Sequence, residues 1–115
     1  MTKQDMSTLL HGLDIPVGEG EHFLDSREHM PKVAYWEYVW EDNMASGDDY
    51  EEVVTYQISF VAQRPRDVKL LELKRALNSV GIHPVFYHEY VTSEKSPGYY
   101  HTYFNLDVEE ELTNV

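Results

Sequence analysis

Six histidines are the side chains of this sequence best suited to bind a metal or to move a proton. His83, His88 and His101 lie on segments with strand character, whereas His22 and His29 lie in an irregular stretch. Two histidines of one strand need an i, i+2 spacing to share a face, and His83 and His88 have opposite parity instead. The helical pairs HxxxH and HExxH are absent, and there is no cysteine. We therefore expect neither a metal site nor a cofactor.

Acidic residues around one predicted turn are the second candidate for chemistry. They are Glu41, Asp42, Asp48, Asp49, Glu51 and Glu52. Met44 and Val53 occupy places where a calcium loop needs oxygen ligands, so a solvated acidic turn is favoured over a calcium site. The sequence also lacks a nucleophile elbow and a glycine-rich phosphate loop, because Gly18-Glu19-Gly20 is too short for one. We expect no enzymatic activity, and we expect the acidic turn to serve either solubility or contact with a partner.

Composition restricts the class of protein further. The 115 residues predict a single domain over 1–115, and 42% hydrophobic residues with 13% aromatic residues are typical of a folded globule. The absence of cysteine gives no indication of an oxidising compartment, and no apolar run approaches the roughly 20 residues of a membrane span. A net charge of −12 argues against broad contact with the phosphates of nucleic acid.

The elements that position these residues are organised around one strand and the helix after it. Residues 53–62 alternate β-branched or aromatic with polar side chains, which predicts a strand. A tight connection through Arg64, Pro65 and Arg66 follows. Asp67 is a good helix cap, the next apolar residues recur at helical spacing, and Gly81 is placed to end the helix.

The rest of the chain supplies a second helix and three more strands. Residues 2–13 predict a short helix capped at Thr2 or Ser7, and residues 14–32 predict a long irregular connection with a short extended piece at Ile15-Pro16-Val17. The further strands are expected at 33–40, 84–91 and 99–108. This order predicts an α+β fold: an α-β-β-α-β-β sandwich, with a four-stranded mixed sheet and both helices on one face. It corresponds to a ferredoxin-like fold whose first strand has moved to the end of the chain, with the second and fourth strands central.

Aromatic residues occur on both faces of the predicted outer strands. Strict alternation places Trp36, Tyr38 and Trp40 on one face and Tyr35 and Val39 on the other. A single sheet covered by two helices should be polar on its open side, so the second aromatic set needs a cover. Either the connection 14–32 folds over that face, or a neighbouring subunit packs against it.

Four segments resemble the tail terminator family of long-tailed bacteriophages, also called tail completion or head-to-tail joining proteins. They are the strand at 35–38, the strand at 54–60, the leucine-rich helix that ends at Gly81-Ile82, and the segment 98–104. The resemblance covers nearly the whole chain, and it lies in the length of the chain, the order of its elements and the pattern of its residue types. It implies a hexameric ring that caps the tail tube and presents a surface to the head connector.

The resemblance implies a virion structural protein that works by assembly in the tail or neck, after being made in the host bacterial cytoplasm. Its partners would be further copies of itself, the tail tube protein and the head connector, with DNA passing through the ring without sequence-specific contact and with no membrane involved. The alternatives are a neck or head-completion protein and a small acidic protein directed at a host target. The residues that we expect at interfaces are Trp36, Tyr38, Trp40, Asp42, Asp48, Asp49, Tyr50, Arg64, Arg66, Tyr99 and Tyr100.

Overall fold

The computed structural model describes residues 1–20, 30–43, 51–93 and 96–110. Within them lie two helices and five strands, in the order α1 (Lys3–His11), β1 (Val17–Glu19), β2 (Lys32–Asn43), β3 (Glu51–Ala62), α2 (Val68–Ser79), β4 (Tyr87–Ser93) and β5 (Ser96–Glu110). The expected α+β class is confirmed. The expected four-stranded sheet is wrong, because a fifth strand forms inside the segment that we predicted to be irregular.

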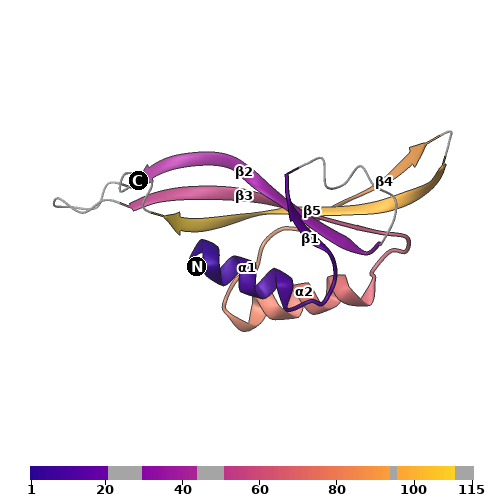
Figure 1. Ribbon diagram of the computed structural model, residues 1–115, viewed down its shortest axis with the longest axis horizontal. Helices are drawn as coiled ribbons and strands as arrows, with labels where there is room; N and C mark the ends of the chain where they lie inside the picture. The colour runs from indigo at the N-terminus through magenta and orange to yellow at the C-terminus, as the bar shows by residue number, and fades with distance from the viewer. Residues whose placement is uncertain (21–29, 44–50, 94–95, 111–115) are drawn as a thin grey trace.

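The strands form one sheet in the order β1-β2-β3-β5-β4, so that β3 and β5 are central as predicted. The neighbours β2 and β3, β3 and β5, and β5 and β4 are antiparallel, whereas β1 runs parallel to β2. Because β3 and β4 are both antiparallel to β5, they run parallel to each other, and α2 makes the crossover between them. Both helices lie on the same side of the sheet (Figure 1).

The additional strand β1 is three residues long and begins where the predicted extended piece ends. Val17, Gly18 and Glu19 pair with Val33, Ala34 and Tyr35 of β2. A three-residue segment that contains a glycine is too short to show an alternating pattern, which explains why the sequence did not predict it as a strand.

The helices begin where the sequence predicts. Thr2 caps α1 in a reciprocal pair: the Asp5 N–H donates to the Thr2 hydroxyl, and the Thr2 N–H donates to the Asp5 carboxylate, both over 3.1 Å. Asp67 caps α2 by accepting from the Lys69 N–H over 2.9 Å. Gly81 follows α2 with a φ of 82°, which explains why a residue without Cβ ends this helix.

The core lies between the helices and one face of the sheet. Alternate residues of β3 point into it, and each is at most 1% exposed; they are Val54, Tyr56, Ile58, Phe60 and Ala62. The apolar faces of α1 and α2 complete the core with Met6, Leu10, Leu73 and Leu77. β5 contributes Phe104, Leu106 and Val108, so the two central strands carry most of the sheet's buried surface.

A β-bulge at Tyr38 changes which face the residues of β2 occupy. Glu37 pairs with Tyr56, but Val39 pairs with Thr55, so Tyr38 is an additional residue in β2. Trp36 therefore pairs with Gln57 on the open face, whereas Trp40 pairs with Val54 on the helix face. The expectation that Trp36, Tyr38 and Trp40 share a face is wrong, because strict alternation does not continue through a bulge.

The face opposite the helices is polar along its centre. The Thr55 hydroxyl donates to the Asp107 carboxylate over 2.7 Å, and the Gln57 amide donates to the Ser59 hydroxyl over 3.4 Å. Large aromatic side chains flank this polar strip. Trp36 lies beside Gln57 on one side, and the stacked rings of Tyr87 and Tyr103 lie on the other. The open side is thus a polar strip on the central strands with an aromatic border.

One part of that face is buried within a single chain. Ala34 and Ser59 are 0% exposed and Val61 is 1% exposed, although they point away from the helices. A neighbouring subunit is therefore not required to cover this position. Residues 21–29 of the connection that we expected to fold over the face lie outside the described residues.

Candidate functional site

The connection between β3 and α2 places two arginines at the end of the central strand. Pro65 cannot donate a backbone hydrogen bond, so the ladder stops near Ala62 and the chain turns. Arg66 has a φ of 53°, a left-handed conformation that is uncommon for a residue other than glycine. Asp67 then starts α2. This short turn holds the exposed side chains of Arg64 and Arg66 beside the sheet.

A hollow of about 360 Å³ opens next to this turn. Its lining joins β3, the turn, the first part of α2, β4 and β5, and it consists of Phe60, Ala62, Arg64, Pro65, Arg66, Leu70, His88, Glu89, Tyr90, Tyr100, His101 and Thr102. A second hollow of about 230 Å³ lies alongside and shares Arg66, Leu70 and His88 with the first; Leu71, Lys74 and Phe86 complete it. We call the two together the basic groove.

The strand register builds the floor of the basic groove. Ala62, Tyr100 and Tyr90 lie in one row across β3, β5 and β4, and the rings of Tyr90 and Tyr100 are 4.8 Å apart between centroids. Gly98 lies beneath Tyr90, where a Cβ would overlap the phenol ring. The floor is therefore aromatic, and a residue without a side chain leaves space for one of its rings.

The next row brings a histidine and a threonine together. His88 pairs with Thr102, and the His88 Nδ1 and the Thr102 hydroxyl are 2.9 Å apart. Thr102 is only 4% exposed, so its hydroxyl is poorly placed to attack a substrate. This contact is better explained as satisfying a buried hydroxyl than as an activated nucleophile.

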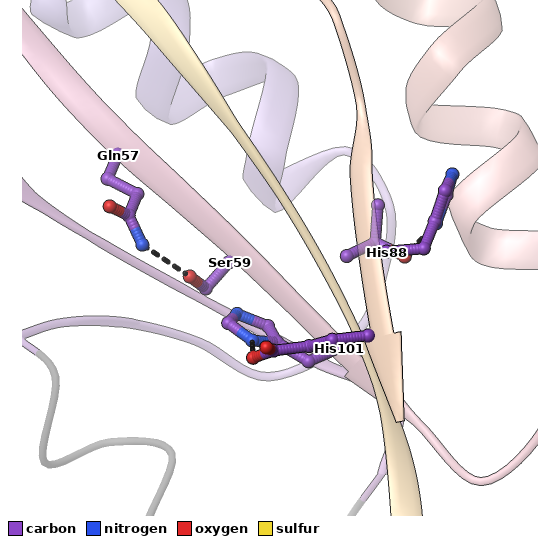
Figure 2. A network of polar contacts seen from close by, with 6 residues as sticks. Gln57, Ser59, His88 and His101 are labelled. Carbon is purple, nitrogen blue, oxygen red and sulfur yellow. Dashed lines mark hydrogen bonds and ion pairs between the residues drawn. The ribbon is translucent and has the colours of Figure 1, made fainter. Parts of the chain in front are cut away.

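His101 and His88 come from neighbouring strands but point to opposite faces of the sheet (Figure 2). The His101 Nδ1 lies 2.7 Å from the Glu89 carboxylate, and its ring is 5.1 Å from that of Tyr103. The structure thus separates the histidines that the sequence placed on adjacent strands. Among the residues that the structure describes, no group of three or more histidines, aspartates or glutamates could hold a metal.

Positive charge is concentrated in the turn and helix that border the basic groove. Five of the nine lysines and arginines lie between residues 64 and 75, namely Arg64, Arg66, Lys69, Lys74 and Arg75, against two acids, Asp67 and Glu72. Lys69 forms an ion pair with Glu72 over 3.3 Å. Arg64, Arg66 and Lys74 form no ion pair with any residue that the structure describes. A chain with a net charge of −12 therefore presents a cationic surface with an apolar floor at this groove.

The opposite end of the sheet carries exposed aromatic and acidic side chains. Tyr38 is 60% exposed and Trp40 is 63% exposed, and the Trp40 Nε1–H donates to the Glu37 carboxylate over 3.1 Å. Glu41 and Glu109 are also exposed, and both pair with Val53. We call this surface the Trp40 end.

The predicted interface residues thus divide into separate groups. Arg64, Arg66 and Tyr100 line the basic groove, and Tyr38 and Trp40 belong to the Trp40 end. Trp36 and Tyr99 are half-buried on the open face. The backbone of Asp42 pairs with that of Glu52, whereas Asp48, Asp49 and Tyr50 lie outside the described residues.

Sequence reasoning missed Phe60, Leu70, His88 and Tyr90 as groove residues. The alternation of side chains along the strands could have identified them, because it shows which residues face the helices. A crossover from β3 to β4 then places the first turn of α2 over the row that contains Tyr90.

No protein-family model and no curated protein matches this sequence. In the part of the chain that the structure describes, neither helix has the length and apolar character needed to cross a membrane.

Proposed function

We propose that this protein is a structural component of a long-tailed bacteriophage, a tail terminator that assembles with copies of itself on the end of the tail tube and joins it to the head connector. The resemblance of its sequence to that family motivates the proposal. The fold that goes with it is the ferredoxin-like sandwich with its first strand moved to the end.

The observation that carries the proposal is the distribution of exposed apolar side chains. Tyr38, Val39 and Trp40 are exposed at one end of β2, and Val85, Tyr87 and Tyr90 are exposed on or just before β4. β4 is the last strand in the sheet order, so its outer edge has no strand neighbour among the described residues. Exposed aromatic residues beside an open strand edge are typical of a surface that binds another protein.

The basic groove supports binding over catalysis. Its floor is aromatic, its rim is cationic, and Thr102, whose hydroxyl contacts His88, is only 4% exposed. Such a surface is suited to an acidic or aromatic protein segment.

Inactivation of the gene in its phage tests the proposal. Without a terminator we expect tail tubes of uncontrolled length that carry no heads, because nothing stops their polymerisation, and the wild-type protein supplied from a plasmid should restore normal particles. Electron micrographs give the answer. Tails of normal length that fail to attach to heads would instead favour the neck protein, and infectious particles of normal form would contradict both.

A further inference from the structure

We infer that the basic groove is the acceptor for the Trp40 end of a second copy of this chain, so that the protein associates head to tail. The inference rests on the proposed function in that the protein must self-associate. It goes further by assigning the two surfaces that meet.

The Trp40 end has the chemistry of a ligand for the groove. Trp40 is 63% exposed and projects from the helix face of the sheet, since it pairs with Val54. The carboxylate of Glu37, which is exposed on the same face, accepts the Trp40 Nε1–H over 3.1 Å. Exposed carboxylates of Glu41, Asp107 and Glu109 lie in the two adjacent rows, on the opposite face of the same end of the sheet. The Trp40 end is therefore an aromatic projection with one carboxylate beside it, at an acidic end of the sheet.

The basic groove offers the complement. A hollow of about 360 Å³ with Phe60, Tyr90 and Tyr100 in its lining has room for an aromatic side chain. Arg64 and Arg66 stand at its rim without an ion-pair partner among the described residues. Guanidinium groups pair with carboxylates and also stack on an indole ring, so both features of the Trp40 end find partners there.

The two surfaces cannot meet within one chain. Trp40 and the basic groove both lie on the helix face, but their rows cross β3 at Val54 and at Ala62. Eight residues of strand separate them by about 26 Å, at roughly 3.3 Å per residue. A donor and an acceptor at opposite ends of one rigid sheet, which belongs to a molecule 55 Å long, produce a heterologous contact. Repeating that contact gives a ring or a chain of copies.

Charge makes a second copy a better occupant than another anion. Each copy of the chain carries both the Trp40 end and the basic groove, so the two surfaces are present in equal numbers at any protein concentration. A nucleic acid would bind the cationic rim, but it would be repelled by the rest of a chain with a net charge of −12.

A complementation experiment tests the inference on the full chain. Trp40→Ala removes the donor and keeps the acceptor, whereas Arg64→Glu with Arg66→Glu removes the acceptor and keeps the donor. We expect each variant to be monomeric by light scattering at concentrations where the wild type associates, with dissociation constants raised roughly 30-fold or more. Mixed together, the two should form a 1:1 dimer and nothing larger, because one intact donor meets one intact acceptor.

The controls make the result specific. Arg75→Glu makes the same kind of charge change at an exposed residue of α2, the helix that follows the turn. Arg75 lies outside the lining of the groove, so this variant should associate like the wild type. If Trp40→Ala does not fold, as judged by circular dichroism, Glu37→Lys replaces it as the donor variant, because Glu37 is exposed beside Trp40 on the same face.

Three outcomes would overturn the inference. In the first, each variant still associates like the wild type. In the second, the variants are monomeric and fail to form the 1:1 dimer. In either case self-association of the wild type would stand. Alternatively, the wild type could remain monomeric while its groove binds a DNA oligonucleotide in an Arg64-dependent manner. The last outcome would also count against the proposed ring, whereas the first two would leave it intact.

Discussion

The two ends of the sheet carry aromatic side chains on the same face, yet one end is hollow and the other projects. One end of the sheet, which we call the Ala62 end, carries the basic groove. There Leu70 from the first turns of α2 and Tyr90 and Tyr100 from the sheet line one cavity. At the Trp40 end, β2 and β3 continue beyond both helices (Figure 1). The position of the helices along the sheet thus decides which aromatic residues form a floor and which remain exposed.

Charge separates in the same direction. The turn and helix at the Ala62 end hold five of the nine basic residues of the chain. Glu41, Asp107 and Glu109 mark the other end, where the described strands carry no lysine or arginine between Trp36 and Asn43 or between Tyr99 and Glu110. The net charge of the chain therefore describes neither end. The length of the sheet keeps the basic and the acidic side chains too far apart to neutralise each other.

The largest expected effect comes from breaking the middle of the sheet, which both ends share. Phe104 is 1% exposed, pairs with Ile58 and lies 4.9 Å from the ring of Phe86. Phe104→Ala should lower the free energy of unfolding by about 3–5 kcal/mol, because it leaves a cavity between sheet and helices. Chemical denaturation measures this loss. Its exposed neighbour supplies the control: Asn105→Ala should change stability by less than about 0.5 kcal/mol, and equal losses would contradict the assignment of the two faces.

A smaller effect should be confined to the groove end. At Gly98 a Cβ would overlap the Tyr90 ring and come within 2.8 Å of the Val91 carbonyl oxygen. Gly98→Ala should therefore lower the free energy of unfolding by about 1–3 kcal/mol. In the background of Tyr90→Ala the cost should fall without vanishing, because only the ring overlap is relieved. A cost that is the same in both backgrounds, measured by thermal unfolding, would show that Tyr90 does not lie over Gly98.

Much of this architecture follows from the sequence because its signals are long and local. The alternation from Val54 to Phe60 and the helical spacing after Asp67 each extend over several turns or pairs, and both predicted caps form. The short strand β1 gives no such signal, since three residues cannot establish a period.

The site was predicted only in part, for a physical reason. Arg64 and Arg66 can be identified from sequence because they flank a proline turn, whereas Leu70 and Tyr90 become their neighbours only through the crossover. The bulge at Tyr38 is also invisible to an alternating pattern, although it decides that Trp40 lies on the helix face. Local periodicity determines elements, and register and crossover determine which residues meet.

A still smaller effect should test how the Trp40 end is stabilised. The Glu109 N–H donates to the Met1 carbonyl oxygen over 3.1 Å, which joins the start of α1 to β5 near that end. Thr2→Ala removes the cap of α1 and should cost about 1 kcal/mol. Thr8→Ala is the matched control, because the Thr8 hydroxyl has only a 3.4 Å contact with the Gln4 amide. Equal stabilities of the two variants in urea would argue against the reciprocal cap.

The same cap predicts a direction with pH. Hydrogen bonds from the Thr2 backbone and side chain lower the pKa of Asp5 below its ordinary value of 3.8. A lowered pKa in the folded state means that the carboxylate stabilises the fold above the unfolded pKa and loses this contribution as the pH falls through the folded one. The difference in stability between the wild type and Asp5→Asn should therefore shrink below about pH 4. A difference that stays constant between pH 7 and pH 3 would show that the charge of Asp5 plays no part in the cap.

The smallest effect on stability is expected where the effect on binding should be large. Arg64 is exposed and forms no ion pair with the described residues, so Arg64→Ala should change the free energy of unfolding by less than about 0.5 kcal/mol. Lys69→Ala is the comparison at the same end, because Lys69 has a 3.3 Å ion pair with Glu72 and should lose slightly more. Thermal unfolding at low and high salt measures both. A loss above 1 kcal/mol for Arg64→Ala would mean that this arginine stabilises the turn, and the groove rim would then be part of the fold and not a surface left free for a partner.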